Sequence, residues 1–440
     1  MEFQFRLMSV DGIPPWGAER GRPHLSWFGL TLGWFWIEVG GQELFRYSPE
    51  FREYQQRQYP QWAQAPLPYA DYEDYQVVRY WEDLLERLPA ILEPLPDDLA
   101  ARVDAAEEWL SWQAQAVAWQ ERQADESAWN TYFAAVGWWS ERTWDAGHLK
   151  YPPRLWVWRE QDTVMVRWDN RDVAVEGIPV WTARRGEIAL PVGKFLAAVT
   201  SFHRRFLAEM ESRITETERV RSRPHIEIDF PMLKGEQQDR FRRLEGALQP
   251  RTSSWKEARA AITVIDQELE RDRRRLLEAD NLIAAGDRHF HADTPTFEEA
   301  QSLYHEALLL RMAARGEQHE SVAVAMNRLA NVYYQQQNQE AAGTLFERAL
   351  AIREIVLPPD APDLRLSVNN LANVYRNQGR FAEAEPLYRR SLRMREQEAG
   401  HADHPAIWRN LVRVLEGQGK LAEAAEYLQR IQLFEAAQSG

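Results

Sequence analysis

The chain has 440 residues, is 45% hydrophobic and contains no cysteine. This length predicts two or three domains of about 150 residues each, and the lack of cysteine excludes disulfides, thiolate zinc sites, iron–sulfur clusters and a cysteine nucleophile. The formal net charge of −14 provides no overall basic field, so nucleic-acid binding is disfavoured.

Two patterns bear on where the protein works. Residues 1–6 lack the basic-then-apolar layout of a signal peptide. No uncharged run approaches the roughly 20 residues that are needed to cross a bilayer. We therefore expect a cytoplasmic protein that does not insert into membranes.

The distribution of tryptophan indicates separate domains. Of 19 tryptophans, 17 lie between Trp16 and Trp181, whereas the later chain is rich in Ala, Leu, Glu, Gln and Arg. We expect a Trp-rich α+β domain over residues 1–220, a helical linker region over 221–274 and an all-α helical-repeat superhelix over 275–440.

Alternating apolar residues predict strands in the first part of the chain. Phe3, Phe5 and Leu7 alternate with polar positions. A hairpin is predicted over 155–168, where two alternating runs flank the turn at 160–162.

Apolar residues at helical spacing predict helices over 109–119 and 195–210. Between residues 221 and 235, prolines and a glycine surround a short alternating run, which indicates a linker or an edge strand. The sequence of residues 254–257, Ser-Trp-Lys-Glu, has capping-box spacing, so a helix should begin there and continue past Arg275.

The last third of the chain repeats itself. Leu329–Tyr333 recurs as Leu371–Tyr375, an offset of 42 residues. The same offset relates Tyr304, Phe346 and Tyr388, then Leu308, Leu350 and Leu392, and also Arg311, Arg353 and Arg395. Each copy holds two helical stretches, with Gly379 and Gly419 at the turn in two copies and Asn338 at that place in an earlier one. Repeats of this size bury their apolar face only by stacking, which predicts a superhelix with a concave face.

The segments Asn370–Tyr375 and Gln378–Tyr388 resemble tetratricopeptide repeats of the 42-residue variety found in kinesin light chains and many bacterial regulators. The resemblance covers residues 275–436 and implies about four helix pairs, the first with a longer turn at 287–295. His404-Pro405 is similar to the His-Pro that opens the first helix in that family. Ala361-Pro362 and His319-Glu320 depart from it.

The same resemblance implies that the first helix of each pair lines a groove for a partner peptide or protein. The matching positions are Asn327, Asn331, Asn369, Asn373, Arg409 and Arg413, with Arg376 and Asn377 along the groove edge. Amide side chains donate and accept together, which suits an extended peptide backbone, and the arginines suit a carboxylate. The alternative is that some of the asparagines bond between neighbouring repeats and bind no partner.

Patches across residues 3–215 resemble a bacterial domain family of unknown function. They include residues 14–17, 25–31, 44–47, 144–149, 156–158, 166–170 and Phe202. This resemblance implies a fold unit and no mechanism.

Several patterns that suggest chemistry have simpler explanations. The run from Gly186 to Lys194 has the wrong spacing for a phosphate loop. His289 and His291 lack a third metal ligand at a recognisable spacing, and His401 and His404 fall in an inter-repeat loop. We therefore expect no metal and no cofactor.

Structural roles also explain most of the other charged and aromatic groups. The basic run Arg271–Arg275 is surrounded by glutamates and indicates a solvated helix face. Aromatic side chains at alternating or helical spacing are more often core than a stacking surface. Asp145 with His148, or Trp168 with Asp169, could line a cleft in the aromatic domain.

The leading interpretation is a non-enzymatic scaffold or adaptor with no catalytic residues. The family resemblance implies a bacterial signalling or defence system, in which the protein is the partner or substrate of a protease. The alternative is an enzyme or toxin-like effector in residues 1–220 that the repeats regulate. Oligomeric state and partner identity are not predicted.

Overall fold

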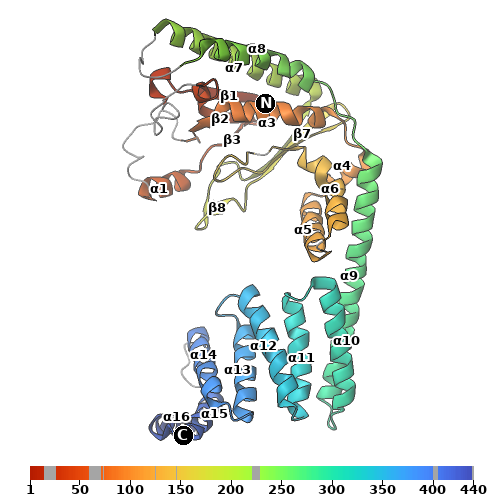
Figure 1. Cartoon of the computed structure of the whole chain (residues 1–440), viewed down its shortest axis with the longest axis vertical. Helices are drawn as coiled ribbons and strands as arrows, with labels where there is room; N and C mark the ends of the chain where they lie inside the picture. The colour runs from red at the N-terminus through yellow and green to blue at the C-terminus, as the bar shows by residue number, and fades with distance from the viewer. Residues whose placement is uncertain are drawn as a thin grey trace. The chain divides into compact units, whose positions relative to one another are not determined.

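The computed structural model describes residues 1–13, 26–58, 71–72, 74–123, 125–144, 146–220, 228–399 and 405–438. The contacts within the chain divide it into two compact units, which can be followed by colour in Figure 1. The first unit comprises residues 1–115 and 129–262, and the second comprises residues 116–128 and 263–440.

Antiparallel strands form the frame of the first unit. One sheet has the order β1 (Glu2–Leu7), β2 (Leu32–Val39) and β3 (Gln42–Leu44), and β4 (Asp74–Gln76) also pairs with β2. A second sheet has the order β10 (Arg185–Pro191), β7 (Thr163–Asp169), β6 (Leu155–Glu160) and β5 (Thr143–Trp144). Strands β8 (Ala174–Val175) and β9 (Ile178–Pro179) form a short ribbon. The predicted strand at Phe3–Leu7 and the predicted hairpin over 155–168 are confirmed.

Helices complete the first unit. They are α1 (Pro49–Gln58), α3 (Val77–Leu92), α4 (Asp97–Asp104), α5 (Ala106–Gln123), α6 (Glu126–Ser140), α7 (Val192–Val220) and α8 (Phe230–Ala247), with short 3-10 turns at Val10–Gly12 and Gly29–Thr31. The last turns of α5, from Ala116, belong to the second unit. The helices predicted over 109–119 and 195–210 are confirmed as parts of α5 and α7.

The aromatic side chains of the first unit form its core. On α7, the apolar stripe Phe195, Val199, Phe202, Phe206 and Met210 is fully buried. Phe3 of β1 stacks on Phe202 with ring centroids 5.5 Å apart, and Phe5 meets Phe206 edge-on at 5.6 Å. Aromatic pairs of this kind stabilise by about 0.5–1.5 kcal/mol beyond the burial of their area. Much of the aromatic content therefore serves packing.

Helix α8 packs against α7 and α3. Gln237 accepts from the Trp27 indole at 2.9 Å and donates to the Leu207 carbonyl at 2.8 Å. Residues 221–227, where a linker or edge strand was considered, lie outside the described residues, and Phe230 begins a helix capped by Asp229. The boundaries at residues 220 and 274 stay a prediction, although α8 is a packed part of the first unit.

The second unit consists of stacked helix pairs. After α9 (Trp255–Phe290), which starts in the first unit, come α10 (Phe297–Arg315), α11 (Glu320–Gln335), α12 (Gln339–Val356), α13 (Pro362–Asn377), α14 (Phe381–Ala399), α15 (Pro405–Gly417) and α16 (Leu421–Gln438). Consecutive pairs pack through α12 against α13 and α14 against α15. The expected helix start near residue 254 and the longer first turn, between Phe290 and Phe297, are confirmed. Among the described residues, no helix is both long enough and apolar enough to span a membrane.

Positions related by 42 residues have the same environment. Tyr304, Phe346 and Tyr388 are each at most 1% exposed. Two of the repeated arginines make equivalent hydrogen bonds. Arg311 donates to the Ser321 carbonyl at 2.8 Å, and Arg353 donates to the Asp363 carbonyl at 2.9 Å. Each arginine thereby fixes the first turn of the following helix to the preceding pair.

The turns inside the pairs show one departure from the prediction. Gly379 and Gly419 have positive φ angles of 74° and 75°, as expected for a left-handed turn residue. In the earlier copy, Gln337 takes that conformation with φ of 63°, whereas Asn338 caps α12 by accepting from the Ala341 amide. The prediction of Asn338 at this place was therefore wrong by one residue.

Candidate functional site

Side chains from three successive first helices join in one hydrogen-bonded network. Arg376 near the end of α13 donates through Nη1 to Asn410 Oδ1 of α15 at 2.5 Å. Its Nη2 lies 3.5 Å from the Tyr334 hydroxyl of α11. Asn377 Nδ2 donates to the same hydroxyl at 2.9 Å. The guanidinium of Arg376 is thus held between the preceding and the following helix pair.

The network continues inward through Asn373. Its Oδ1 accepts from Asn410 Nδ2 at 3.3 Å and from the Tyr388 hydroxyl of α14 at 2.6 Å. Burial raises the pKa of Tyr388, while the nearby Arg376 and Arg413 act in the opposite direction. Because the pKa is raised overall, the hydroxyl stays protonated at neutral pH and donates to Asn373.

The asparagines predicted to bind a partner fall into different environments. Asn327 is 9% exposed, and its Nδ2 donates to the Ala323 carbonyl at 3.1 Å and to Ser367 Oγ of α13 at 3.3 Å. Asn327 therefore bonds between neighbouring repeats, which is the alternative left open by the sequence. Asn331 and Asn369 are half-buried, and Asn369 Oδ1 has no hydrogen-bond partner within the described residues.

The two arginines predicted on the last first helix are exposed. Arg409 forms an ion pair with Glu435 of α16 at 2.7 Å. Arg413 is close enough to Tyr388 to influence its pKa. Arg413 is therefore next to the network, whereas Arg409 is directed to the following helix.

Three members of the network were not predicted: Tyr334, Tyr388 and Asn410. Tyr388 was recognised only as a buried repeat position. Tyr334 directly follows Tyr333, a residue of the repeated motif. Asn410 directly follows Arg409, which was predicted to bind a partner. Their roles depend on contacts between layers, which sequence spacing does not give.

The first helices differ in charge from the chain as a whole. Helices α11, α13 and α15 carry five arginines, no lysine and three carboxylates, although the whole chain has a net charge of −14. Two of these carboxylates, Glu320 and Asp363, stand in first turns, and Glu320 pairs with Arg353 at 2.9 Å. The first helices are therefore locally basic.

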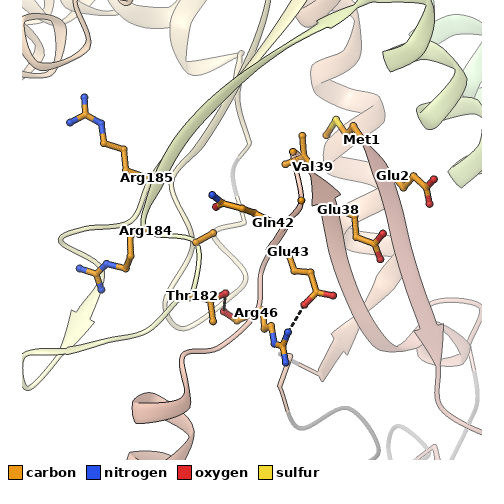
Figure 2. A pocket seen from close by; sticks show the side chains of 13 residues that line it. Met1, Glu2, Glu38, Val39, Gln42, Glu43, Arg46, Thr182, Arg184 and Arg185 are labelled. Carbon is orange, nitrogen blue, oxygen red and sulfur yellow. Dashed lines mark hydrogen bonds and ion pairs between the residues drawn. The ribbon is translucent and has the colours of Figure 1, made fainter.

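A hollow of about 990 Å³ lies in the first unit (Figure 2). The turn at Gly40 and Gly41 forms part of its wall, together with Glu43, Arg46 and the segment 182–185. Its charged groups are engaged: Arg46 pairs with Glu43 at 2.7 Å, Arg184 donates to a backbone carbonyl and Arg185 pairs with Glu107. Figure 2 shows Arg184 and Arg185 pointing away from Glu43. This arrangement offers no paired nucleophile and base.

The cleft considered around residues 144–148 is closed by aromatic side chains. Trp144 is 3% exposed and lies 5.9 Å from the Phe3 ring. His148 stacks on Tyr75 at 4.7 Å and lies 3.6 Å from an Asp83 carboxylate oxygen. Asp145 lies outside the described residues. The described surroundings of Trp144 and His148 are those of a packed core.

The second predicted pair, Trp168 and Asp169, does line a hollow, of about 440 Å³. Arg171 donates two hydrogen bonds to the Asp169 carboxylate, from Nε at 2.9 Å and from Nη2 at 2.6 Å. These hydrogen bonds hold the pKa of Asp169 below its usual value, against the opposing effect of burial. An ionised, paired carboxylate of this kind is unsuited to act as a general acid.

The remaining patterns have structural roles. The run Gly186–Lys194 is strand β10 followed by the start of α7, so it is no phosphate loop. His289 Nδ1 lies 2.7 Å from Thr296 Oγ1, and His401 and His404 lie outside the described residues. In the part of the chain that the structure describes, no cluster of three or more side chains could hold a metal ion. The basic run at 271–275 is paired with neighbouring carboxylates along α9.

A model of a family of unknown function, DUF5984, matches residues 2–261. The chain belongs to the DUF5984 family. A tetratricopeptide-repeat model matches residues 290–355 and 364–431 of this DUF5984 protein, which confirms the repeats and the predicted order of an α+β region followed by helical repeats. Repeats of this kind support a protein-interaction scaffold.

Solved structures with detectable similarity to this DUF5984 protein include BtubC (BKLC) from P. vanneervenii, with 18% identity, 54% of this chain and 92% of that chain covered, and a TM-score of 0.35. A putative kinesin light chain with nearly identical TPR-like repeats from Podosopora anserina has 18% identity, 53% and 97% coverage and a TM-score of 0.30. The MamA protein has 15% identity, 47% and 88% coverage and a TM-score of 0.29. No curated protein matches the chain.

Proposed function

We propose that this DUF5984 protein is a non-enzymatic scaffold or adaptor that holds an extended segment of a partner protein along the first helices of its repeats. The observation that carries the proposal is the network around Arg376. Its guanidinium is oriented by Asn410 and Tyr334 from two neighbouring layers, while Arg413, on the same helix as Asn410, is exposed.

The chemistry of these helices favours an acidic partner segment. Arginine binds carboxylates through paired hydrogen bonds, and the first helices carry an excess of arginine. The half-buried amides of Asn331 and Asn369 supply groups that both donate and accept, which a peptide backbone requires. Asn327 supports this surface from within by bonding to Ser367.

Binding of the full chain to an array of Asp- and Glu-rich peptides, each with a matched Asn/Gln version, tests the proposal. We expect the acidic peptides to bind more tightly. Arg376→Ala with Arg413→Ala should weaken that binding at least about tenfold, since a hydrogen bond to a charged group contributes about 1.5–3 kcal/mol. Arg348→Ala is the matched control, because within the described residues this exposed arginine of α12 pairs with Glu317 alone. Equal binding of acidic and amide peptides would exclude the acidic-segment proposal.

We further propose that this protein works in a bacterial cytoplasmic signalling or defence system together with a protease. The protease is either the partner that the repeats bind or an enzyme that cleaves this protein as a substrate. The support is the resemblance to bacterial repeat proteins alone. Incubation of the intact protein with a protease encoded beside its gene tests this: a discrete cleavage or a stable complex supports the proposal, and the lack of both counts against it.

A further inference from the structure

Helix α6 carries large aromatic side chains on two opposite faces. On the inner face, Trp138 and Trp139 are at most 5% exposed and pack against other tryptophans. On the outer face, Trp129 and Phe133 are 49% and 47% exposed. The two outer rings contact each other, with centroids 4.4 Å apart. Adjoining aromatic rings that stay half in water mark an interaction surface more clearly than a single exposed ring does.

Gly137 continues this outer stripe by one more turn. Trp129, Phe133 and Gly137 are spaced four residues apart, so they lie along one side of the helix. Glycine weakens a helix interior relative to alanine. A Cβ at Gly137 would meet no atom within 4 Å among the described residues outside its own stretch of helix, so packing inside the chain does not require glycine here. Space for a side chain from outside therefore remains at this point of the stripe.

The order of the three residues is self-complementary. Trp129 stands four residues before Phe133 and Gly137 four residues after it, so each lies about 6 Å from Phe133 along the helix axis. When a second α6 runs antiparallel to the first, with a two-fold axis at Phe133, each Trp129 ring faces the Gly137 of the other copy. The two Phe133 rings then meet at the axis. A two-fold interface uses the same patch on both chains, and large residues opposite small ones let the two helices interdigitate.

The charges on α6 also favour a second copy as the occupant. Glu126 in the first turn is the only charged residue of this helix. Residues 129–140 are uncharged, so two stripes can meet without like-charge repulsion at the contact, although each chain has a net charge of −14. An acidic or basic partner segment would find no opposite charge on the stripe.

From the exposed rings, the open space at Gly137 and the lack of charge, we propose that the outer stripe of α6, formed by Trp129, Phe133 and Gly137, binds the same stripe of a second copy of this chain. The 15 residues of α6 span about 22 Å. One helix face of this length covers less than the roughly 800 Å² per partner of a standard interface, so the dimer is reversible, with a dissociation constant in the micromolar range. The stripe lies in the first unit, and this inference is independent of peptide binding by the repeats.

Sedimentation velocity of the full chain from about 1 to about 200 µM tests the proposal, because this range brackets the affinity expected of so small an interface. We expect the average mass to rise from 51.5 kDa, the mass of one chain, towards twice that value. Phe133→Glu should raise the dissociation constant at least about tenfold, since it removes both central rings and places two carboxylates at the axis.

Leu309→Glu is the matched control, because Leu309 is 52% exposed on α10 and outside the stripe. The mass of a single chain at every concentration would overturn the proposal and assign the stripe to a different partner. A dimer that Phe133→Glu leaves unchanged, or that both variants weaken equally, would also overturn it.

Gly137→Leu tests the facing of large and small residues. The new side chain fills the space that Trp129 of the second copy occupies, so the dissociation constant should again rise about tenfold. Because a Cβ at Gly137 meets no atom within 4 Å, the single chain should keep its fold, which circular dichroism verifies. Undiminished dimerisation of a folded Gly137→Leu variant would overturn the arrangement centred on Phe133.

The lack of cysteine in the chain allows a direct test of the arrangement. Phe133→Cys brings two thiols together at the axis, within reach of a disulfide, whereas the two thiols of a Trp129→Cys dimer are about 12 Å apart. We expect rapid oxidation of Phe133→Cys to covalent dimers and little from Trp129→Cys alone. A mixture of Trp129→Cys with Gly137→Cys should form mixed dimers. Oxidation of Phe133→Cys no faster than that of the control Leu309→Cys would overturn the proposal.

Discussion

Arg376 of α13 donates to the amide oxygen of Asn410 of α15 across 2.5 Å. This bond connects two consecutive first helices and fixes the direction of the guanidinium. Asn410 is therefore a positioning residue for the proposed acidic segment, although it need not touch that segment itself.

Asn410→Ala should weaken binding of acidic peptides about tenfold, because a freely rotating Arg376 loses the pre-organisation of its hydrogen bonds. The free energy of unfolding should fall by only about 1 kcal/mol, since Asn410 is half-buried. Calorimetric titration together with urea denaturation separates the two effects. Asn370→Ala, at a half-buried position of α13, is the control. Loss of stability without loss of affinity would show that Asn410 is merely structural.

Arg353 fastens one helix pair to the next and should matter for stability. Its side chain is 5% exposed, pairs with Glu320 at 2.9 Å and donates to Ser367 Oγ at 2.8 Å. Arg353→Ala should lower the unfolding free energy of the repeat unit by about 2–3 kcal/mol, because Glu320 and the Asp363 carbonyl lose a charged donor. Helical circular dichroism in urea measures this change. Arg348→Ala, which removes an exposed pair, should change it by less than about 0.5 kcal/mol, and similar losses in both variants would contradict the assignment.

The local parts of the fold were predictable because each depends on a short period. Alternation at Phe3 and Phe5 marked β1, the apolar spacing of 195–210 marked α7, and the 42-residue offset gave Tyr304 and Tyr388 the same burial. In each case the signal lies within a few residues or in a repeated copy, where geometry fixes which side chains face inward.

Contacts between distant segments could not be predicted in the same way. Asn327 and Asn369 are equivalent positions 42 residues apart, yet Asn327 bonds to Ser367 between layers, whereas Asn369 Oδ1 has no hydrogen-bond partner within the described residues. The difference arises from the side chain that the neighbouring helix places opposite each asparagine. The spacing of residues within one helix does not predict that side chain. The packing of α8 on α7 likewise includes a contact between distant segments, the hydrogen bond from the buried Gln237 to the Leu207 carbonyl.

Gln337 occupies a turn position that favours glycine. Its φ is 63°, and a left-handed conformation costs a residue with a Cβ about 1–2 kcal/mol. Gln337→Gly should therefore stabilise the repeat unit by about 0.5–1 kcal/mol, after the greater flexibility of glycine in the unfolded chain is deducted. The reciprocal change Gly379→Gln should destabilise it by a similar amount, because Gly379 has φ of 74°. Thermal melting of both variants measures the two changes in stability. A Gln337→Gly variant that is less stable than the unmodified chain would show that the backbone at Gln337 is not strained.

Glu385 of α14 should make the repeats sensitive to acid. Burial tends to raise the pKa of Glu385, but hydrogen bonds from Lys420 and Gln418 and the charge of Arg389 lower it overall. A carboxyl whose folded pKa is depressed stabilises the fold above its unfolded pKa of about 4.3 and loses that contribution as the pH falls through the folded pKa. The side chain is 7% exposed, and Lys420 lies 2.7 Å away.

Lys420→Met should therefore move the pKa of Glu385 upward, because burial then acts with less opposition, and acid unfolding of the repeats should begin at a higher pH. Carboxyl-detected NMR titration reports the pKa, and urea midpoints at a series of pH values report the stability. Lys420→Arg keeps the charge and should leave the acid transition close to that of the unmodified chain. If Lys420→Met and Lys420→Arg titrate alike, the ion pair does not control this carboxyl, and burial together with Arg389 must set its protonation.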